Sequence, residues 1–138
     1  MNTQKILIAG IVGGIFSFFL GWLVFGVLLK DMDPGGFTSI MRPKEDFIAW
    51  SMLLSNICWA VLLSYIFVQW ANINTLQGGA SAGAIIGFLA IASFDFGMYA
   101  TTTLFTLQSL ATDIVINIIM GALVGGFIGL WLGWRAKK

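Results

Sequence analysis

Four long apolar segments, separated by shorter connections, limit the fold of this chain more than any other feature of its sequence. They cover approximately residues 5–29, 47–70, 78–101 and 113–134. A helix needs about 20 apolar residues to cross the hydrocarbon core of a bilayer, so each segment is long enough. None shows the alternating pattern of a β-barrel strand, and helices then satisfy the backbone within lipid. The sequence predicts an all-α polytopic membrane protein with one four-transmembrane-helix domain over residues 1–138.

The composition excludes a soluble domain. Of the 138 residues, 59% are hydrophobic and only 9% are charged, whereas a soluble domain is about one quarter charged. The formal net charge of +1 indicates no nucleic-acid partner.

Residues that support catalysis are sparse in this chain. It has no histidine and a single cysteine, Cys58. His-based metal sites, histidine general bases and an intrachain disulfide are therefore excluded. The sequence also lacks a phosphate-binding loop, metal-ligand spacing and a nucleophile motif. We expect no enzymatic activity, no metal and no cofactor, and an enzyme that acts on lipid is the third and most remote hypothesis.

The positive charges indicate an orientation in the membrane. Four spans place both termini on one side, together with Lys5, Arg135, Lys137 and Lys138, and place Lys30, Arg42 and Lys44 on the other side. Cytoplasmic segments carry the excess of lysine and arginine. The difference favours a multi-pass protein of the bacterial inner membrane with both termini in the cytoplasm.

Small residues spaced four apart form rows on three of the four predicted helices, because residues four apart share a helix face. Such rows let two helices approach each other closely. We therefore expect a four-helix bundle packed through glycine rows. The predicted packing residues are Gly10, Gly14, Gly21, Gly79, Gly83, Gly87, Gly121, Gly125, Gly129 and Gly133.

The second apolar segment carries a weakly polar stripe in place of a glycine row. The stripe consists of Ser51, Ser55, Cys58, Leu62, Tyr65 and Gln69. The third connection, over residues 102–112, is uncharged and rich in threonine and serine.

Asp95 is the one ionisable carboxylate inside an apolar run, apart from residues at the span ends. An ionisable residue within a membrane span is by default a functional hypothesis, because its charge is costly there. With a helix rise of about 1.5 Å per residue, Asp95 lies roughly 9 Å inside the end of its span, and Asn117 lies at a similar depth. The predicted polar cluster consists of Asp95, Asp113, Asn117, Asn56, Lys30 and Arg42.

Two interpretations of this cluster remain open at the level of sequence. In the functional one, Asp95 binds a cation, a proton or a small polar solute. In the structural one, Asp95 pairs with Lys30 or Arg42, or with Asn56 and Asn117, and so ties helices to the first connection.

Two short motifs carry a resemblance to known proteins. The first span contains Gly21-Trp22-Leu23-Val24-Phe25-Gly26, and Asn117 precedes a glycine-rich final span that extends through Gly129. In these motifs the chain resembles uncharacterised families of small bacterial four-helix membrane proteins, known only as domains of unknown function. The resemblance implies the architecture and no activity.

The sequence therefore favours an integral membrane protein without catalytic chemistry, which acts by helix–helix contact as a subunit or small scaffold. Its expected partners are membrane lipids and either a second copy of the chain or another membrane protein. The alternative is a transporter or channel for a small solute, a proton or an ion that uses Asp95.

Overall fold

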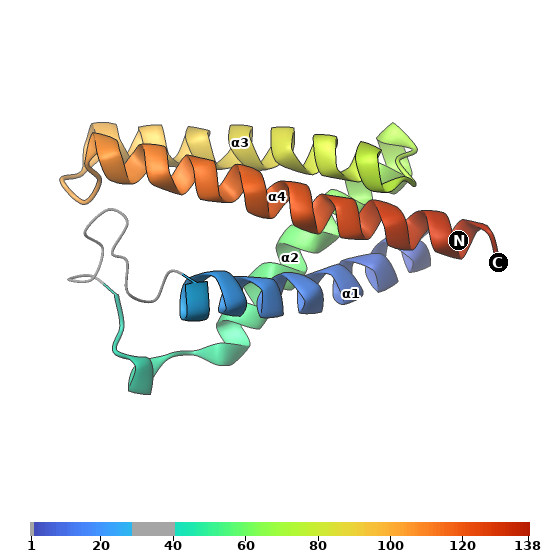
Figure 1. The fold of residues 1–138 in the computed structure, drawn as a ribbon, viewed down its shortest axis with the longest axis horizontal. Helices are drawn as coiled ribbons and strands as arrows, with labels where there is room; N and C mark the ends of the chain where they lie inside the picture. Colours follow the sequence, from blue (N-terminus) through green and yellow to red (C-terminus); the bar gives the residue numbers. More distant parts are fainter. Residues whose placement is uncertain (1, 29–40) are drawn as a thin grey trace.

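The computed structural model describes residues 2–28 and 41–138, and Lys30 lies outside these residues. Every regular element in the described part is helical (Figure 1). The short elements η1 and η4 are π-helical turns that continue α1 and α2, and η3 is a single 3-10 turn. In chain order the elements are α1 (Asn2–Leu23), η1 (Val24–Leu28), η3 (Lys44–Asp46), α2 (Ala49–Ile66), η4 (Phe67–Ala71), α3 (Leu76–Thr101) and α4 (Leu107–Ala136).

Four helical stretches are long and apolar enough to cross a membrane. They are Asn2–Leu28, Ala49–Ala71, Leu76–Thr101 and Leu107–Ala136. The predicted all-α class with four candidate spans is confirmed at this level. The first three stretches also agree with the predicted spans to within one helical turn.

The fourth helix begins at Leu107, six residues before the predicted span over residues 113–134. The cause is a capping box at Thr106. The Thr106 hydroxyl accepts a hydrogen bond from the backbone N–H of Ser109 at 3.1 Å, and the Ser109 hydroxyl accepts one from the N–H of Thr106 at 2.9 Å. These two bonds satisfy donors that a helix start otherwise leaves unpaired. As a result Asp113 lies more than one turn inside α4.

The helices pack mainly as two antiparallel pairs, α1 with α2 and α3 with α4. Between the pairs, the largest contact joins α1 and α4, and α2 contacts α4 less. The consecutive helices α2 and α3 hardly touch. Figure 1 shows α2 running obliquely across α1 and meeting α3 only near the turn that joins them. The fold is therefore more open than a bundle in which every helix has two neighbours.

The two pairs share one apolar core where α1, α2 and α4 meet. Its buried members are Ala9, Ala60, Leu63, Phe67, Val124 and Ile128. A smaller apolar cluster has Ala92, Leu110 and Ile114 as its buried members and lies between α3 and α4, with Phe105 of their connection packed against it. Asp95 is less than one turn from Ala92, and among the described residues it therefore belongs to the part of the molecule that α3, α4 and their connection build.

The backbones of α3 and α4 approach each other closely at several glycines. A Cβ atom at Gly83 would lie 2.9 Å from the Cα of Gly125 and would overlap the carbonyl oxygen of Gly121. A Cβ at Gly79 would likewise overlap the carbonyl oxygen of Gly125, and one at Gly87 would lie 3.0 Å from that of Asn117. These obstacles are backbone atoms, so no change of side-chain rotamer relieves them.

The other predicted packing glycines differ in what lies beside them. Gly129 and Gly133 approach the carbonyl oxygens of Thr75 and Asn74, in the turn before α3. On α1, a Cβ at Gly10 would meet Val61, and one at Gly14 would meet the backbone of Ile57 on α2. At Gly21, in contrast, a Cβ would meet nothing within 4 Å. The prediction that Gly21 packs against a helix was therefore wrong for the described part of the chain, because α2 has diverged from α1 at that level.

Candidate functional site

The candidate site lies at the contact between α3 and α4, near the turn that joins them, and its central residue is Asp95. The Asp95 side chain is 1% exposed. Its Oδ2 atom is buried and has no hydrogen-bond partner among the described residues. Buried polar atoms in proteins are nearly always paired, so an unpaired carboxylate oxygen requires an explanation.

The register of the two helices shows what faces Asp95. Gly83 lies against Gly121, and Gly87 lies against Asn117. Two further turns along this antiparallel contact, Asp95 comes level with Ser109 and one turn from Asp113. The α3 face that carries Gly79, Gly83 and Gly87 therefore continues through Ile91 to Asp95, at the point where α4 presents its own polar residues.

Asp113 is the ionisable group that acts on Asp95. The carboxyl group of Asp113 lies near that of Asp95. Asp113 is half-buried, whereas Asp95 is buried completely. Two neighbouring carboxylates repel each other when both are ionised, and a shared proton or a bound cation removes this repulsion.

The surroundings of the carboxyl pair are apolar or already paired. Ser109 is fully buried, but its hydroxyl donates to the carbonyl oxygen of Thr106 at 2.9 Å and also accepts from the Thr106 N–H. Leu110 and Ile114 belong to the buried cluster around Ala92. Asp95 is therefore poorly solvated, which strengthens any electrostatic interaction that it makes.

Asn117 lies next to the carboxyl pair along α4 but does not complete it. Its Nδ2 donates a hydrogen bond to the backbone carbonyl of Asp113 at 2.9 Å. The side-chain amide of Asn117 therefore forms its hydrogen bond within α4. Among the described residues, no group of three or more histidine, cysteine, aspartate or glutamate side chains could hold a metal ion.

The structure does not bring Asn56 to this site, which corrects the predicted cluster. Ser17 of α1 donates a hydrogen bond to Asn56 Oδ1 at 2.6 Å, and Asn56 Nδ2 donates to the carbonyl oxygen of Met52 at 2.8 Å. Asn56 therefore ties α2 to α1. Depth in the membrane suggested the wrong neighbour, because α2 packs on α1 and not on α3.

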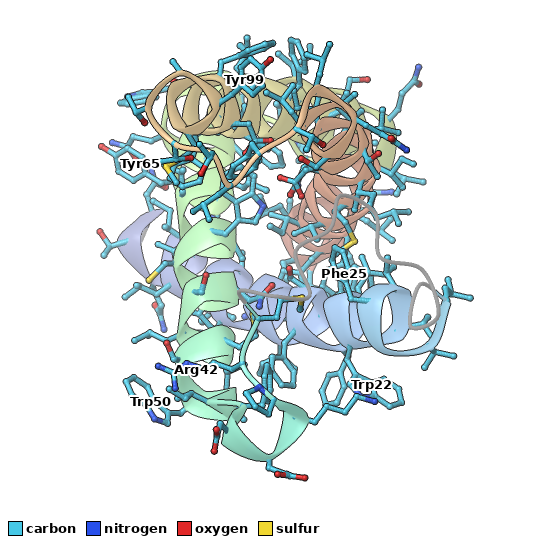
Figure 2. The ribbon with its side chains drawn as sticks, turned by 90° about the vertical axis from the view of Figure 1, so that its left-hand side faces the viewer. Trp22, Phe25, Arg42, Trp50, Tyr65 and Tyr99 are labelled. Carbon is cyan, nitrogen blue, oxygen red and sulfur yellow. The ribbon has the colours of Figure 1, made fainter. Side chains whose placement is uncertain are left out.

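Arg42 is also absent from the site, against the prediction. It is exposed and forms no ion pair with any described residue. Figure 2 shows Arg42 beside Trp50 at the start of α2, far from Tyr99, which lies one turn beyond Asp95 on α3. Lys30 lies outside the described residues. Of the six predicted polar residues, the structure brings Asp95 and Asp113 together, and Asn117 lies one turn further along α4.

A second candidate surface is the polar stripe of α2. The thiol of Cys58 is exposed. The side chains of Leu62 and Tyr65 are 45% and 41% exposed. The remaining members, Ser51, Ser55 and Gln69, are exposed as well. The buried residues of α2 lie on the opposite face, towards α1 and α4. The stripe therefore faces away from the rest of the described structure.

No family model, curated protein or solved structure matches this chain.

Proposed function

We propose that this chain is a multi-pass protein of the bacterial inner membrane that acts by helix–helix contact, as a subunit or small scaffold. The observation that carries the proposal is the exposed polar stripe of α2 (Ser51, Ser55, Cys58, Leu62, Tyr65 and Gln69). A helix that faced only lipid on this side would gain nothing from hydroxyl, thiol and amide groups there.

A neighbouring membrane helix supplies hydrogen-bond partners, which lipid acyl chains lack. Hydrogen bonds between membrane helices are worth about 0.6 to 2 kcal/mol each. Serine and tyrosine hydroxyls and the glutamine amide both donate and accept hydrogen bonds, so the stripe is complementary to itself. The occupant that fits it is therefore a second copy of the chain, with the two α2 helices packed against each other.

In this proposal, glycine rows hold α3 and α4 together, and the polar stripe of α2 therefore stays uncovered. The close approach of α3 to α4 at Gly79, Gly83, Gly121 and Gly125 supports the idea that these rows hold that pair together. A pair that is stabilised by its own backbone contact does not need α2 to cover it.

The single cysteine provides the test, because Cys58 lies in the middle of the stripe. Oxidation of native membranes with copper phenanthroline should join two copies through Cys58 and double the mass on a non-reducing gel. In a Cys58→Ser background, Met52→Cys serves as the matched control. Met52 is 46% exposed but lies about a quarter turn from the centre of the stripe.

The expected result is strong cross-linking at Cys58 and weak cross-linking at position 52. A monomer by light scattering in mild detergent, together with no cross-linked product at Cys58, would exclude the proposed contact. Equal cross-linking at both positions would show random collision, and would exclude it as well.

A second function is favoured by the carboxyl pair. Asp95 carries an unpaired buried oxygen and has the carboxyl group of Asp113 beside it, and this arrangement suits a site for a proton or a small cation. In this proposal Asp95 and Asp113 bind the ion between α3 and α4 during transport.

Ion flux into liposomes that contain the purified protein tests this second function. Asp95→Asn should abolish the flux while the melting temperature and the oligomeric state remain those of the parent protein. Asp46→Asn makes the same chemical change at an exposed carboxylate in η3 and should leave the flux intact. Parent protein that gives no more flux of protons, Na⁺ or K⁺ than empty liposomes would rule out the transport of these ions.

A further inference from the structure

A cavity separates the start of α1 from the end of α4. Its volume is about 210 Å³, and it is lined by Gln4, Lys5, Ile8, Trp131, Leu132 and Arg135, together with Ala136. The lining comes from the two ends of the chain, which Figure 1 shows on the same end of the molecule. The cavity lies on the opposite side of the fold from Asp95 and the α3–α4 turn.

The charge of this cavity is uncompensated. Lys5 and Arg135 both line it, and none of its lining residues is acidic. Neither cation forms an ion pair with any other residue in the described ranges. The acidic side chains of the described residues are in η3 and at the α3–α4 contact, remote from this end of the chain.

The remaining lining residues are of two kinds. Gln4 adds an amide donor next to the cations, whereas Ile8 and Leu132 form an apolar wall. Trp131 also lines the cavity and is half-buried, and tryptophan is enriched at membrane boundaries. A ligand that fits both kinds of wall has an anionic group joined to an apolar chain.

We propose that this cavity binds the phosphate group of an anionic phospholipid. The Arg135 guanidinium can donate two parallel hydrogen bonds to phosphate oxygens, and the Lys5 ammonium adds a second positive charge. Basic pockets between membrane helices bind lipid head groups in this way. The volume is smaller than the roughly 300–1,000 Å³ of pockets for drug-sized ligands, so it suits a head group whose acyl chains lie along the outside of α1 and α4.

The proposal uses the membrane placement of the four helices but neither the α2 contact nor the carboxyl pair. Lys137 and Lys138 provide its internal comparison, since they lie on the same end of the molecule and carry the same charge. Lys137 lines a separate cavity with Asn74 and Trp134, and the Lys138 ammonium lies 4.0 Å from the centre of the Trp134 ring. Neither residue lines the Lys5–Arg135 cavity.

Lipid binding can be measured with purified protein in neutral detergent. Phosphatidylglycerol and phosphatidylcholine are titrated in turn, and bound lipid is counted by native mass spectrometry. One variant carries Lys5→Gln with Arg135→Gln, and the matched control carries Lys137→Gln with Lys138→Gln. Each cation near a lipid head group contributes about fivefold in affinity, so we expect phosphatidylglycerol to bind the first variant roughly 25-fold more weakly. The control should bind nearly as the parent does.

Several outcomes would overturn the proposal. Equal loss of binding in both variants would show general attraction to positive charge, and equal affinity for the two lipids would show that the net negative charge of the lipid is not recognised. If the first variant fails to fold, Lys5→Arg with Arg135→Lys keeps the charges and must restore both folding and phosphatidylglycerol binding. Inorganic phosphate distinguishes the remaining source of the ligand, because protection of the protein against heat by millimolar phosphate, without retention of lipid, would replace the lipid with a free anion.

Discussion

At the scale of single residues, the same amino acid has opposite consequences according to what lies beside it. Gly83 and Gly97 both belong to α3, but a Cβ at Gly83 would meet the backbone of α4, whereas a Cβ at Gly97 would meet nothing within 4 Å. The two positions therefore separate the packing role of glycine from its effect on helix propensity.

Gly83→Ala should lower the free energy of unfolding by about 1 to 3 kcal/mol, because an added methyl group forces two backbones apart. Gly97→Ala should leave stability unchanged or raise it by up to about 1 kcal/mol, since alanine favours the helix over glycine. Unfolding in mixed micelles with increasing sodium dodecyl sulfate measures both. Equal stability of the two variants would remove the packing role assigned to Gly83.

The carboxyl pair also shows which residues of the candidate site can be predicted from the sequence and which cannot. Asp95 was identifiable because a lone carboxylate in an apolar run is conspicuous in the sequence. Its neighbours were not, because depth along a helix does not say which helices touch. Asn56 has a suitable depth, yet its partner is Ser17 of α1. Asp113 was among the candidates, but its position inside a helix depended on a cap at Thr106.

At the scale of elements, the helix boundaries follow from caps as much as from hydropathy. Thr75 accepts a hydrogen bond from the backbone N–H of Gly78 at 3.0 Å and starts α3, and Thr106 starts α4 in the same manner. The capping box at Thr106 uses Ser109 where glutamate or glutamine is more usual. A search of the sequence for the usual acidic pattern therefore misses the first turn and a half of α4, while the apolar run still reveals that the helix exists.

Thr106→Ala should cost about 1 kcal/mol, because it leaves the N–H of Ser109 without its acceptor. The expected local sign is faster hydrogen exchange at the backbone amides of the first turn of α4. Thr103→Ala provides the comparison, since Thr103 is exposed in the same connection and makes no hydrogen bond in the described structure. The assigned cap would be wrong if exchange in this turn were the same in both variants.

At the scale of the whole molecule, the number of spans was predictable and their arrangement was not. Each span is encoded by a local run of apolar residues, such as residues 113–134, and needs no knowledge of its neighbours. Whether α2 covers α3 depends instead on side chains from distant segments, such as Phe67, Val124 and Ile128 in the shared core. Apolar surfaces in lipid have no strong preference for one another, so hydropathy cannot select the pairs.

The proposed orientation predicts which engineered cysteines react from outside the membrane. In a Cys58→Ser background, Lys44→Cys should react with a membrane-impermeant maleimide in intact spheroplasts. Lys138→Cys should react only after the membrane is opened, because both termini are placed in the cytoplasm. The reverse labelling pattern would invert the proposed topology without changing the fold.

The early start of α4 has a geometric consequence for the bilayer. A helix of 30 residues is about 45 Å long at 1.5 Å per residue, whereas the hydrocarbon layer is only about 30 Å thick. Such a mismatch is relieved by tilting or by extension into the head-group layer. Extension at both ends would bring Asp113, and with it Asp95, close to the boundary between hydrocarbon and head groups. At that level an ion from the aqueous phase would have only a few ångströms of interface to cross before it met the carboxyl pair.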